Sequence, residues 1–328
     1  MSRNIASILG TGHYVPSYVL TNAELEKRVE TTDEWIVSRT GIRERRLSAA
    51  NEYSSDMGAA AAKDALAKAG IGADQLDAII TATLTPDYPW PATACIIQQK
   101  IGAPQALAFD LSAACSGFVY AMAVAEGFIA SGTAQHVLVI GAEKLTNIMD
   151  WSDRNTCVLF GDGAGAVVLG PSNGRAVLKA FSLGADGSMV PKLYQPAGGT
   201  VTPASAQTVA DKLHYLKMDG KDVFKFAVRI MGEASLAAAT QAGFKAEDIT
   251  LFIPHQANIR IIESAAKHMG LPMDRVFVNL DRYGNTSAAS VGIALDEAVT
   301  QGRLKAGDKT VLVAFGAGLT WAACAIEW

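Results

Sequence analysis

One pattern occurs twice in this chain, and its first copy is SAACSGFVYAMAVAEGFIASGTAQHVLVIGAE, residues 112–143. A turn of small residues, SAACSGF (Ser112–Phe118), precedes a long apolar helical segment and then a strand-like run, HVLVIGAE (His136–Glu143). The second copy keeps this order, with SAASVGI (Ser287–Ile293) followed by TVLVAFGAG (Thr310–Gly318). The repeat predicts two halves of like topology.

A second pair of segments supports the duplication. AGIGADQLDAII (Ala69–Ile80) and AGFKAEDITLFI (Ala242–Ile253) each contain a helix end, an acidic turn and a buried strand. Strand-like runs alternate with alanine-rich helical runs along the whole chain, which is typical of a layered α/β fold. We therefore expect an N-terminal half at residues 1–172 and a C-terminal half at residues 173–328.

Composition excludes several classes of protein. The chain has 328 residues, is 50% hydrophobic and carries a net charge of −4, with no broad basic surface for nucleic acid. The N-terminus does not resemble a signal peptide, and polar, glycine or proline residues interrupt the apolar runs, so we expect a cytoplasmic protein without a membrane span. The cysteines form no C-x-x-C pair, which argues against a metal site or a disulfide framework; they are Cys95, Cys115, Cys157 and Cys324.

Cys115 is the cysteine that calls for a separate interpretation. It follows the apolar run ALAFDLSAA and precedes a helical stretch, so it is expected in the first turn of a helix. Unpaired N–H groups and the helix dipole there favour a thiolate and would lower the pKa of a cysteine. The alternative is a thiol that only packs among alanines. In the repeat Cys115 falls opposite Ser290, so the halves would share a scaffold and not a chemistry.

Two further polar residues stand at similar junctions. In LFIPHQANIR, His255 follows an apolar strand and precedes a helix beginning near Gln256, and such a position faces the crevice at the carboxyl ends of the strands. In DRYGNTSAAS, Gly284 suits a tight turn and Asn285 comes just before another helix. Each residue alone could be structural, His255 as a core side chain and Asn285 as a turn or N-cap residue.

Four segments then resemble a known family: AACSGF, PHQANIRI, GNTSAAS and the near-terminal AFGAGLTW. They are similar to the signature segments of β-ketoacyl-acyl carrier protein synthase III, and the resemblance extends from LGTGHYVP and TTDEWIVSRTGIRERR to the last strand. It implies a thiolase-like fold with a five-layered α-β-α-β-α core. It also implies an acyltransferase of type II fatty acid synthesis that acts as a homodimer and needs no metal or other cofactor.

The resemblance implies roles for the residues at the three junctions. Cys115 would take the acyl group from a short acyl-CoA, with acetyl-CoA as the expected primer, and its N–H and that of Ala317 would form an oxyanion hole. His255 and Asn285 would donate hydrogen bonds to the carbonyl of malonyl-acyl carrier protein during decarboxylation. The family usually has three glycines after Phe315, whereas this chain has Ala317 at the second place; the backbone N–H survives that change.

Contacts with the substrates are also implied. The residues matching CoA-binding positions of the family are Trp35, Arg39, Arg154, Gly220, Phe224 and Asn258. Those matching the basic patch for the acidic carrier protein are Lys225, Arg260 and Lys267. Trp90 matches an aromatic side chain that in some relatives closes the acyl pocket of the partner subunit. Each set also has a structural alternative. The arginines could extend along apolar surface with their charged ends in water, the basic patch could be ordinary solvated helix charge, and Trp90 could only brace a loop.

Four other functions compete with this one. A thiolase would carry a second catalytic cysteine where Phe315 stands, and a silent acyl-CoA-binding module would have lost one of Cys115, His255 or Asn285. A nicotinamide-dependent dehydrogenase would need a glycine fingerprint, which LGTGHYVP lacks. A related condensing enzyme or acyltransferase of secondary metabolism stays open as the alternative function.

Overall fold

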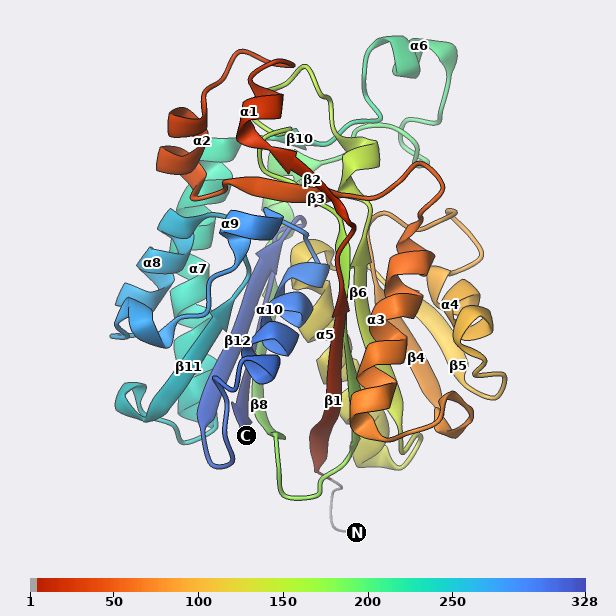
Figure 1. Cartoon of the computed structure of the whole chain (residues 1–328), viewed down its shortest axis with the longest axis vertical. Coiled ribbons are helices and arrows are strands. Elements are labelled where there is room, and N and C mark those ends of the chain that lie inside the picture. The colour runs from red at the N-terminus through yellow and green to blue at the C-terminus, as the bar shows by residue number, and fades with distance from the viewer. Residues whose placement is uncertain (1–4) are drawn as a thin grey trace.

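The computed structural model describes residues 5–328 as a layered α/β fold (Figure 1). The strands are β1 (Ala6–Tyr14), β2 (Tyr18–Thr21), β3 (Glu44–Leu47), β4 (Ala78–Ala82), β5 (Leu107–Leu111), β6 (Val137–Glu143), β7 (Gly163–Pro171), β8 (Val177–Ala185), β9 (Leu193–Tyr194), β10 (Lys217–Met218), β11 (Ile249–Pro254), β12 (Lys309–Gly316) and β13 (Thr320–Glu327). The α-helices are α1 (Asn22–Leu25), α2 (Asp33–Thr40), α3 (Ser54–Ala69), α4 (Thr93–Ile101), α5 (Gly117–Ser131), α6 (Ala206–Ala210), α7 (Gly220–Gln241), α8 (Ile259–His268), α9 (Leu280–Tyr283) and α10 (Ala289–Thr300).

The strand order repeats itself. The nine-stranded sheet has the order β11-β12-β13-β8-β1-β7-β6-β4-β5, and its halves meet at β1 and β8. From this junction outward, β1-β7-β6-β4 corresponds to β8-β13-β12-β11, with antiparallel pairs near the junction and a parallel pair beyond. Outside β11, a parallel bridge between Phe252 and Val276 takes the place that β5 has in the first half. The predicted duplication is confirmed in the topology.

The helices form three layers around the two half-sheets. Figure 1 shows α7 and α8 on one outer side, α3 and α4 on the other, and α5 and α10 between the half-sheets. Each interface has its own cluster of buried apolar residues, and the largest side chains of the central one include Phe118, Met122 and Leu295. This is the expected five-layered arrangement.

The position of α5 between the half-sheets explains its apolar sequence. The segment Ala114–Ser131 is long and apolar enough to cross a membrane by length and composition, with a mean hydropathy of 1.4. Here it packs between the half-sheets, where Phe118, Val119 and Met122 are fully buried. A helix covered by sheets on two sides needs apolar residues around most of its circumference, so the core requires this composition.

The segment between β8 and α7, an excursion from the second half of the fold, forms a cover outside the sheets. It contains the short pair β9 and β10 and the helix α6, which stands away from the body at the top of Figure 1. Three of its apolar residues, Leu193, Leu216 and Met218, turn inward and line a cavity. The composition of residues 186–207, rich in Pro, Gly, Ser and Thr, predicts an excursion from the second half but not this covering role.

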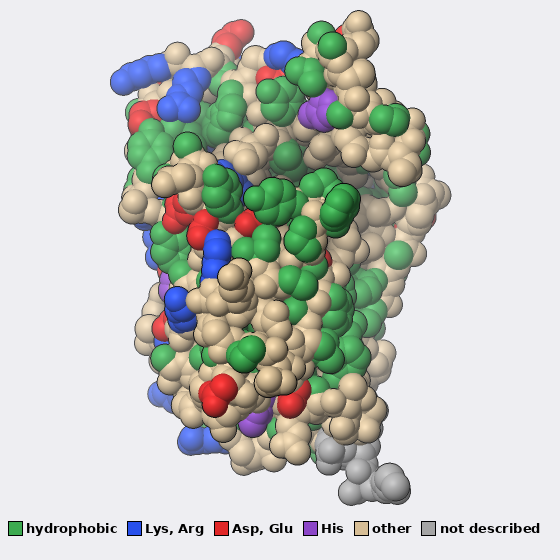
Figure 2. All heavy atoms as spheres, turned by 90° about the vertical axis from the view of Figure 1, so that its right-hand side faces the viewer, with side chains coloured by type: hydrophobic (Ala, Val, Ile, Leu, Met, Phe, Trp, Pro, Cys, Tyr) green, Lys and Arg blue, Asp and Glu red, His purple; other side chains and the backbone are tan. Residues whose placement is uncertain are grey.

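The edge of the first half-sheet leaves apolar side chains in solvent. Strand β5 is the last strand on that side, and Leu107 on it is 41% exposed. In the nearby segment before α4, Tyr88 is 59% and Trp90 is 84% exposed. Figure 2 looks onto this side of the molecule and shows hydrophobic side chains gathered on it.

Candidate active site

Cys115 lies just before α5, in the short 3-10 helix η2 (Ala114–Ser116). The preceding Ala114 has a φ of 46°, a left-handed conformation that is costly for a residue with a side chain. The carboxyl end of β12 presses against this turn, because a Cβ at Gly316 would lie 2.6 Å from the backbone nitrogen of Cys115. Glycine at position 316 therefore permits β12 to approach the backbone of the cysteine.

Burial decides the protonation of Cys115. Desolvation raises the pKa of its thiol to about 12; the Ser287 hydroxyl lowers the pKa and the Glu143 charge raises it by smaller amounts. The lowered pKa expected from the helix terminus is wrong, because loss of hydration outweighs the helix dipole here. The resting side chain is a neutral thiol, so any reaction through its sulfur requires the proton to leave.

His255 directly follows β11 and points into the interior. Its backbone N–H bonds to the Val313 carbonyl at 2.7 Å, and its ring packs edge-on against Phe315 with 5.8 Å between ring centroids. Burial lowers the pKa of His255 to about 3, so the ring is neutral near pH 7. The predicted helix start near Gln256 is displaced: α8 begins at Ile259, with Asn258 as its N-cap.

A hydrogen-bond network selects the tautomer of His255. Nδ1 of the ring lies 2.6 Å from the Ser290 hydroxyl oxygen, and this oxygen also accepts the Gln256 N–H at 3.2 Å. The hydroxyl hydrogen is then available to Nδ1, and we infer that the ring proton sits on Nε2. Nε2 is buried and has no hydrogen-bond partner among residues 5–328.

Asn285 is fixed on both sides by backbone. Gly284 before it has a φ of 63°, and a Cβ there would lie 2.7 Å from the Leu159 carbonyl oxygen. Asn285 donates its backbone N–H to that carbonyl, and its side-chain Oδ1 accepts the Ser287 N–H at 2.8 Å. With Oδ1 occupied in this way, the amide NH2 is the end left free to donate to a ligand.

These side chains meet in one cavity, which Ala317 also lines. Its walls are mostly apolar, formed by Leu84, Leu145, Leu159, Phe160, Leu193, Leu216, Met218, Val223, Ile261 and Phe315. A thiol and two N–H donors face this space. Such a site suits a nucleophile that takes an acyl group and donors that stabilise an oxyanion.

The six residues expected at the CoA site fall into two sets. Gly220, Phe224 and Asn258 line the cavity itself. Trp35, Arg39 and Arg154 gather outside its lining, with the Arg154 and Arg39 guanidinium carbons 5.2 and 5.8 Å from the centre of the Trp35 ring. Asn258 connects the two sets, because its side-chain amide donates to the Arg39 carbonyl at 3.0 Å.

The residues expected to contact other proteins lie on the surface. Lys225 on α7 and Arg260 and Lys267 on α8 are exposed, and the Arg260 guanidinium stacks 5.2 Å from the centre of the Phe224 ring, a wall of the cavity. Trp90 does not line the cavity of its own chain. Its exposure leaves it free to contact another molecule.

Sequence reasoning missed Glu143, Ser287 and Ser290. The sequence repeat aligns Ser290 with Cys115 but does not reveal that the Ser290 hydroxyl is hydrogen-bonded to His255. Glu143 is fully buried at the carboxyl end of β6. A charged residue ending a strand of otherwise apolar residues was the available signal.

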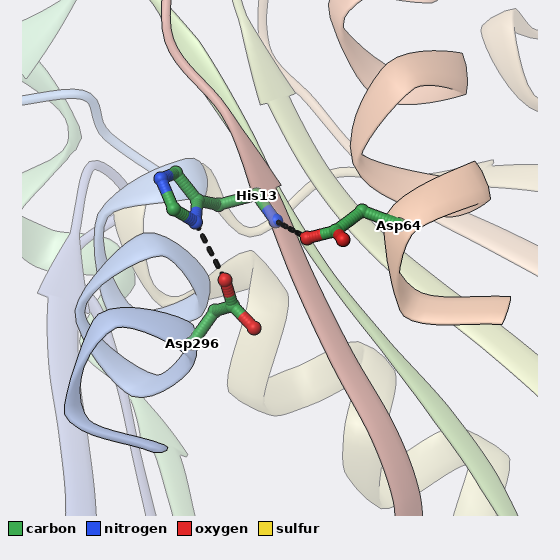
Figure 3. A group of neighbouring side chains, drawn as sticks. All are labelled: His13, Asp64 and Asp296. Atoms are coloured by element: carbon green, nitrogen blue, oxygen red, sulfur yellow. Dashed lines mark hydrogen bonds and ion pairs between the residues drawn. The ribbon is translucent and has the colours of Figure 1, made fainter. Parts of the chain in front are cut away.

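One group among residues 5–328 has the composition of a metal site, namely His13, Asp64 and Asp296 (Figure 3). Asp296 on α10 accepts from the Thr11 hydroxyl at 2.6 Å and lies 2.6 Å from Nδ1 of His13. The Lys68 ammonium binds Asp296 at 2.7 Å and Asp64 at 2.8 Å. A lysine already supplies the cation here, and the cluster ties α10 to β1 and α3 across the half-sheet.

Comparison with known proteins gives a consistent result over the chain. Residues 109–187 match the family described as 3-oxoacyl-[acyl-carrier-protein] synthase III, and residues 239–328 match its C-terminal family. A β-ketoacyl-[acyl-carrier-protein] synthase III from Caldanaerobacter subterraneus subsp. tengcongensis is 54% identical over 324 residues, which cover 98% of this chain and 98% of the relative.

Solved structures agree. The 3-oxoacyl-[acyl-carrier-protein] synthase III of Aquifex aeolicus is 48% identical with a TM-score of 0.92, and the match covers 98% of this chain and 100% of that one. A priming β-ketosynthase from a polyketide biosynthetic pathway is 38% identical with a TM-score of 0.91, covering 99% of this chain and 96% of its own.

Proposed function

The chain belongs to the β-ketoacyl-[acyl-carrier-protein] synthase III family, and from this premise we propose that Cys115, His255 and Asn285 are its catalytic residues. It is an acyl-transferring condensing enzyme that initiates fatty acid synthesis. The observation that carries the residue assignment is that the thiol and two hydrogen-bond donors face one apolar cavity.

The first half-reaction loads the enzyme. Sγ of Cys115 attacks the thioester carbon of acyl-CoA, the bond from that carbon to the CoA sulfur breaks, and the acyl group stays on the cysteine. The backbone N–H groups of Cys115 and Ala317 stabilise the negative oxygen of the tetrahedral intermediate. The thiol gives up its proton in this step.

The second half-reaction forms the new carbon–carbon bond. His255 Nε2–H and Asn285 Nδ2–H donate to the thioester carbonyl of malonyl-acyl carrier protein. The bond to the carboxylate breaks, CO₂ leaves, and the electron pair forms an enolate that the two donors stabilise. The enolate carbon attacks the acyl carbon and expels Sγ of Cys115, which regains a proton. A neutral His255 is suited to this role because it donates from Nε2 without first having to take up a proton.

The same proposal assigns the substrate contacts. Trp35 and Arg154 hold the adenine of CoA between them, and Arg39 meets the phosphates. The Arg154 guanidinium lies 5.2 Å from the centre of the Trp35 ring, so it has to move away from the indole to admit the base. Gly220, Phe224 and Asn258 line the path of the pantetheine arm. Lys225, Arg260 and Lys267 bind the acidic surface of the carrier protein by charge complementarity.

The primer is short, with acetyl-CoA as the leading candidate, and the enzyme is a cytoplasmic homodimer. The exposed edge strand β5 and the apolar residues near it support a symmetric dimer that pairs these edges. Sedimentation at micromolar concentration checks the assembly, and an active monomer would contradict it.

A condensing enzyme of secondary metabolism is the second candidate, because the polyketide priming β-ketosynthase has nearly the same fold. A panel of acyl-CoAs followed by malonyl-acyl carrier protein distinguishes the two by product mass. Acyl-enzyme on Cys115 and 3-ketoacyl-acyl carrier protein from acetyl-CoA are expected, and Cys115→Ser should form neither. An acyl mass on Cys95, Cys157 or Cys324 would refute the assignment of the nucleophile.

A further inference from the structure

Glu143 is a buried carboxyl group that the reaction above does not use. It ends β6 and has no exposed surface. Its Oε2 accepts from the Thr85 hydroxyl at 2.5 Å, from the Thr83 hydroxyl at 3.2 Å and from the Leu84 and Thr85 N–H groups at 3.2 Å. Oε1 accepts only from the Leu84 N–H, at 3.3 Å, which also donates to Oε2. The carboxyl group is therefore held in place, and Oε1 keeps lone pairs that can accept a proton.

Ser287 lies between Glu143 and the nucleophile. It lines the same cavity as Cys115 and is 1% exposed, and its φ of 50° is a left-handed conformation stabilised by the bond from its N–H to Asn285. Its hydroxyl oxygen is buried without a partner at hydrogen-bonding geometry among residues 5–328. The backbone brings Ser287 beside the end of β6, because a Cβ at Gly141, two residues before Glu143, would meet the carbonyl oxygen of Ala288, the residue after Ser287. In keeping with this, the Ser287 hydroxyl lowers the pKa of both the Cys115 thiol and the Glu143 carboxyl.

We propose that Glu143 accepts the proton of Cys115 through the Ser287 hydroxyl when the enzyme is acylated, and returns it when condensation releases the thiol. This inference rests on the proposed role of Cys115 as the nucleophile. Ser287 is the contact to the reacting sulfur, and Glu143 acts through it.

The proton and electron balance is complete. On acylation the Sγ–C bond forms, the thiol proton passes to the Ser287 oxygen, and the hydroxyl proton of Ser287 passes to Glu143. The CoA sulfur leaves with the electron pair of its broken bond and takes a proton from water. On condensation Sγ leaves the acyl carbon with its electron pair, and the proton stored on Glu143 returns by the same path.

The ionisation of Glu143 is suited to this exchange. Burial is the main cause that raises the pKa of Glu143, to about 7, and the bonds from Thr85, Ser287, Leu84 and Thr83 oppose it. Near neutral pH such a group both accepts and returns a proton readily.

Other charged groups around Glu143 are engaged elsewhere. Lys144, the next residue in the chain, donates to the Ala49 and Glu52 carbonyls. Asp162 precedes Gly163, the residue that pairs with Glu143 across β6 and β7, and it accepts from the hydroxyls of Ser48 and Thr146. His255 faces the cavity as a neutral ring. Among the charged groups on the helices packed against β6, Asp56 pairs with Lys100, Asp64 and Asp296 pair with Lys68, and Glu297 pairs with Arg282.

The test measures the rate at which Cys115 is modified as a function of pH, with acetyl-CoA and separately with iodoacetamide, by peptide mass spectrometry on the full-length enzyme. Wild type should become faster as the pH rises through about 7, because Glu143 must be ionised to accept the proton. Glu143→Gln should lose this inflection and react about 10²-fold more slowly at pH 7.5. Glu143→Asp, which keeps a carboxylate, should regain the inflection.

Controls separate a relay from a folding effect. Ser287→Ala leaves Glu143 intact and should lose the same inflection, and the double variant should be no slower than the slower single variant. Asp296→Asn removes another buried carboxylate and should keep the wild-type profile. An unchanged profile in Glu143→Gln, or in Ser287→Ala where the former does not fold, overturns the relay. Failure of wild type to acylate Cys115 at all would instead overturn the proposed function.

Discussion

The hydroxyl oxygen of Ser290 lies 2.6 Å from Nδ1 of His255, and Ser290 occupies the place in the second half that Cys115 has in the first. Both residues begin a central helix, α5 or α10, beside the carboxyl end of a half-sheet. The duplicated scaffold thus supplies the proposed nucleophile in one copy. In the other copy it supplies the group that orients the histidine facing that nucleophile.

Ser290→Ala tests this relationship. Without the hydroxyl, Nδ1 loses its donor and the proton no longer prefers Nε2, so decarboxylation of malonyl-acyl carrier protein should fall. A hydrogen bond with a net value of about 1 kcal/mol corresponds to about fivefold in rate. Acylation of Cys115 should be unchanged, and Ser290→Thr, which keeps the hydroxyl, should restore decarboxylation. Equal losses in both half-reactions would indicate a general packing defect.

His255→Ala and Asn285→Ala should separate the half-reactions. In the proposed mechanism both residues donate to the malonyl carbonyl, whereas Cys115 alone takes the acyl group, so each variant should still form acyl-enzyme. Loss of one such donor typically costs about 10²-fold or more in rate. Release of CO₂ from malonyl-acyl carrier protein measures the effect, and a variant that decarboxylates at the wild-type rate would disprove the role of that residue.

The sequence predicts those features of the site that depend on local pattern. Cys115 and His255 each stand where a strand passes into a helix, Asn285 stands just before α10, and the repeated segments predict the repeated strand order around them. We keep the division at residue 172 as a proposal, supported by the short link between Pro171 at the end of β7 and Val177 at the start of β8.

What the sequence could not predict depends on residues far apart in the chain. The pKa of Cys115 is raised by enclosure, and part of that enclosure comes from Leu193 and Leu216 in the excursion. The approach of Glu143 to Ser287 joins the two halves of the fold. The local pattern of apolar and polar residues predicts neither the raised pKa of Cys115 nor the proximity of Glu143 to Ser287.

Asp296 should make stability depend on acid pH. Although burial opposes it, bonds from His13, Lys68 and Thr11 hold the pKa of Asp296 at about 2, below its ordinary value of 3.8. A lowered folded-state pKa contributes stability that is complete above the unfolded value and is lost as the pH falls toward 2. Asp296→Asn should therefore cost about 2 kcal/mol of unfolding free energy at pH 7 and progressively less below pH 4.

Urea unfolding at pH 7, 4 and 3 measures this difference. Glu327→Gln is the control, because the ion pair of Glu327 with Lys179 is exposed and should contribute about 0–1 kcal/mol. If the loss of unfolding free energy in Asp296→Asn did not become smaller with falling pH, the side chain of Asp296 would stabilise α10 through its shape and not through its charge.

Trp90 should set the length of the primer. It is 84% exposed and absent from the lining of its own cavity, which fits an indole that enters the acyl pocket of the partner subunit. If it closes that pocket, long chains would have to displace it against overpacking costs of about 1–3 kcal/mol, so wild type should favour acetyl-CoA and other short primers. Trp90→Ala should extend acylation to octanoyl-CoA and longer chains while acetyl transfer stays largely intact.

The control is Tyr18→Ala, which removes an exposed aromatic side chain on β2 and should leave the chain-length profile unchanged. Acyl-enzyme masses across a chain-length series provide the measurement. A wild type that already prefers decanoyl-CoA, or a Trp90→Ala variant with the wild-type profile, would show that another side chain closes the pocket, because removing the indole should otherwise open it.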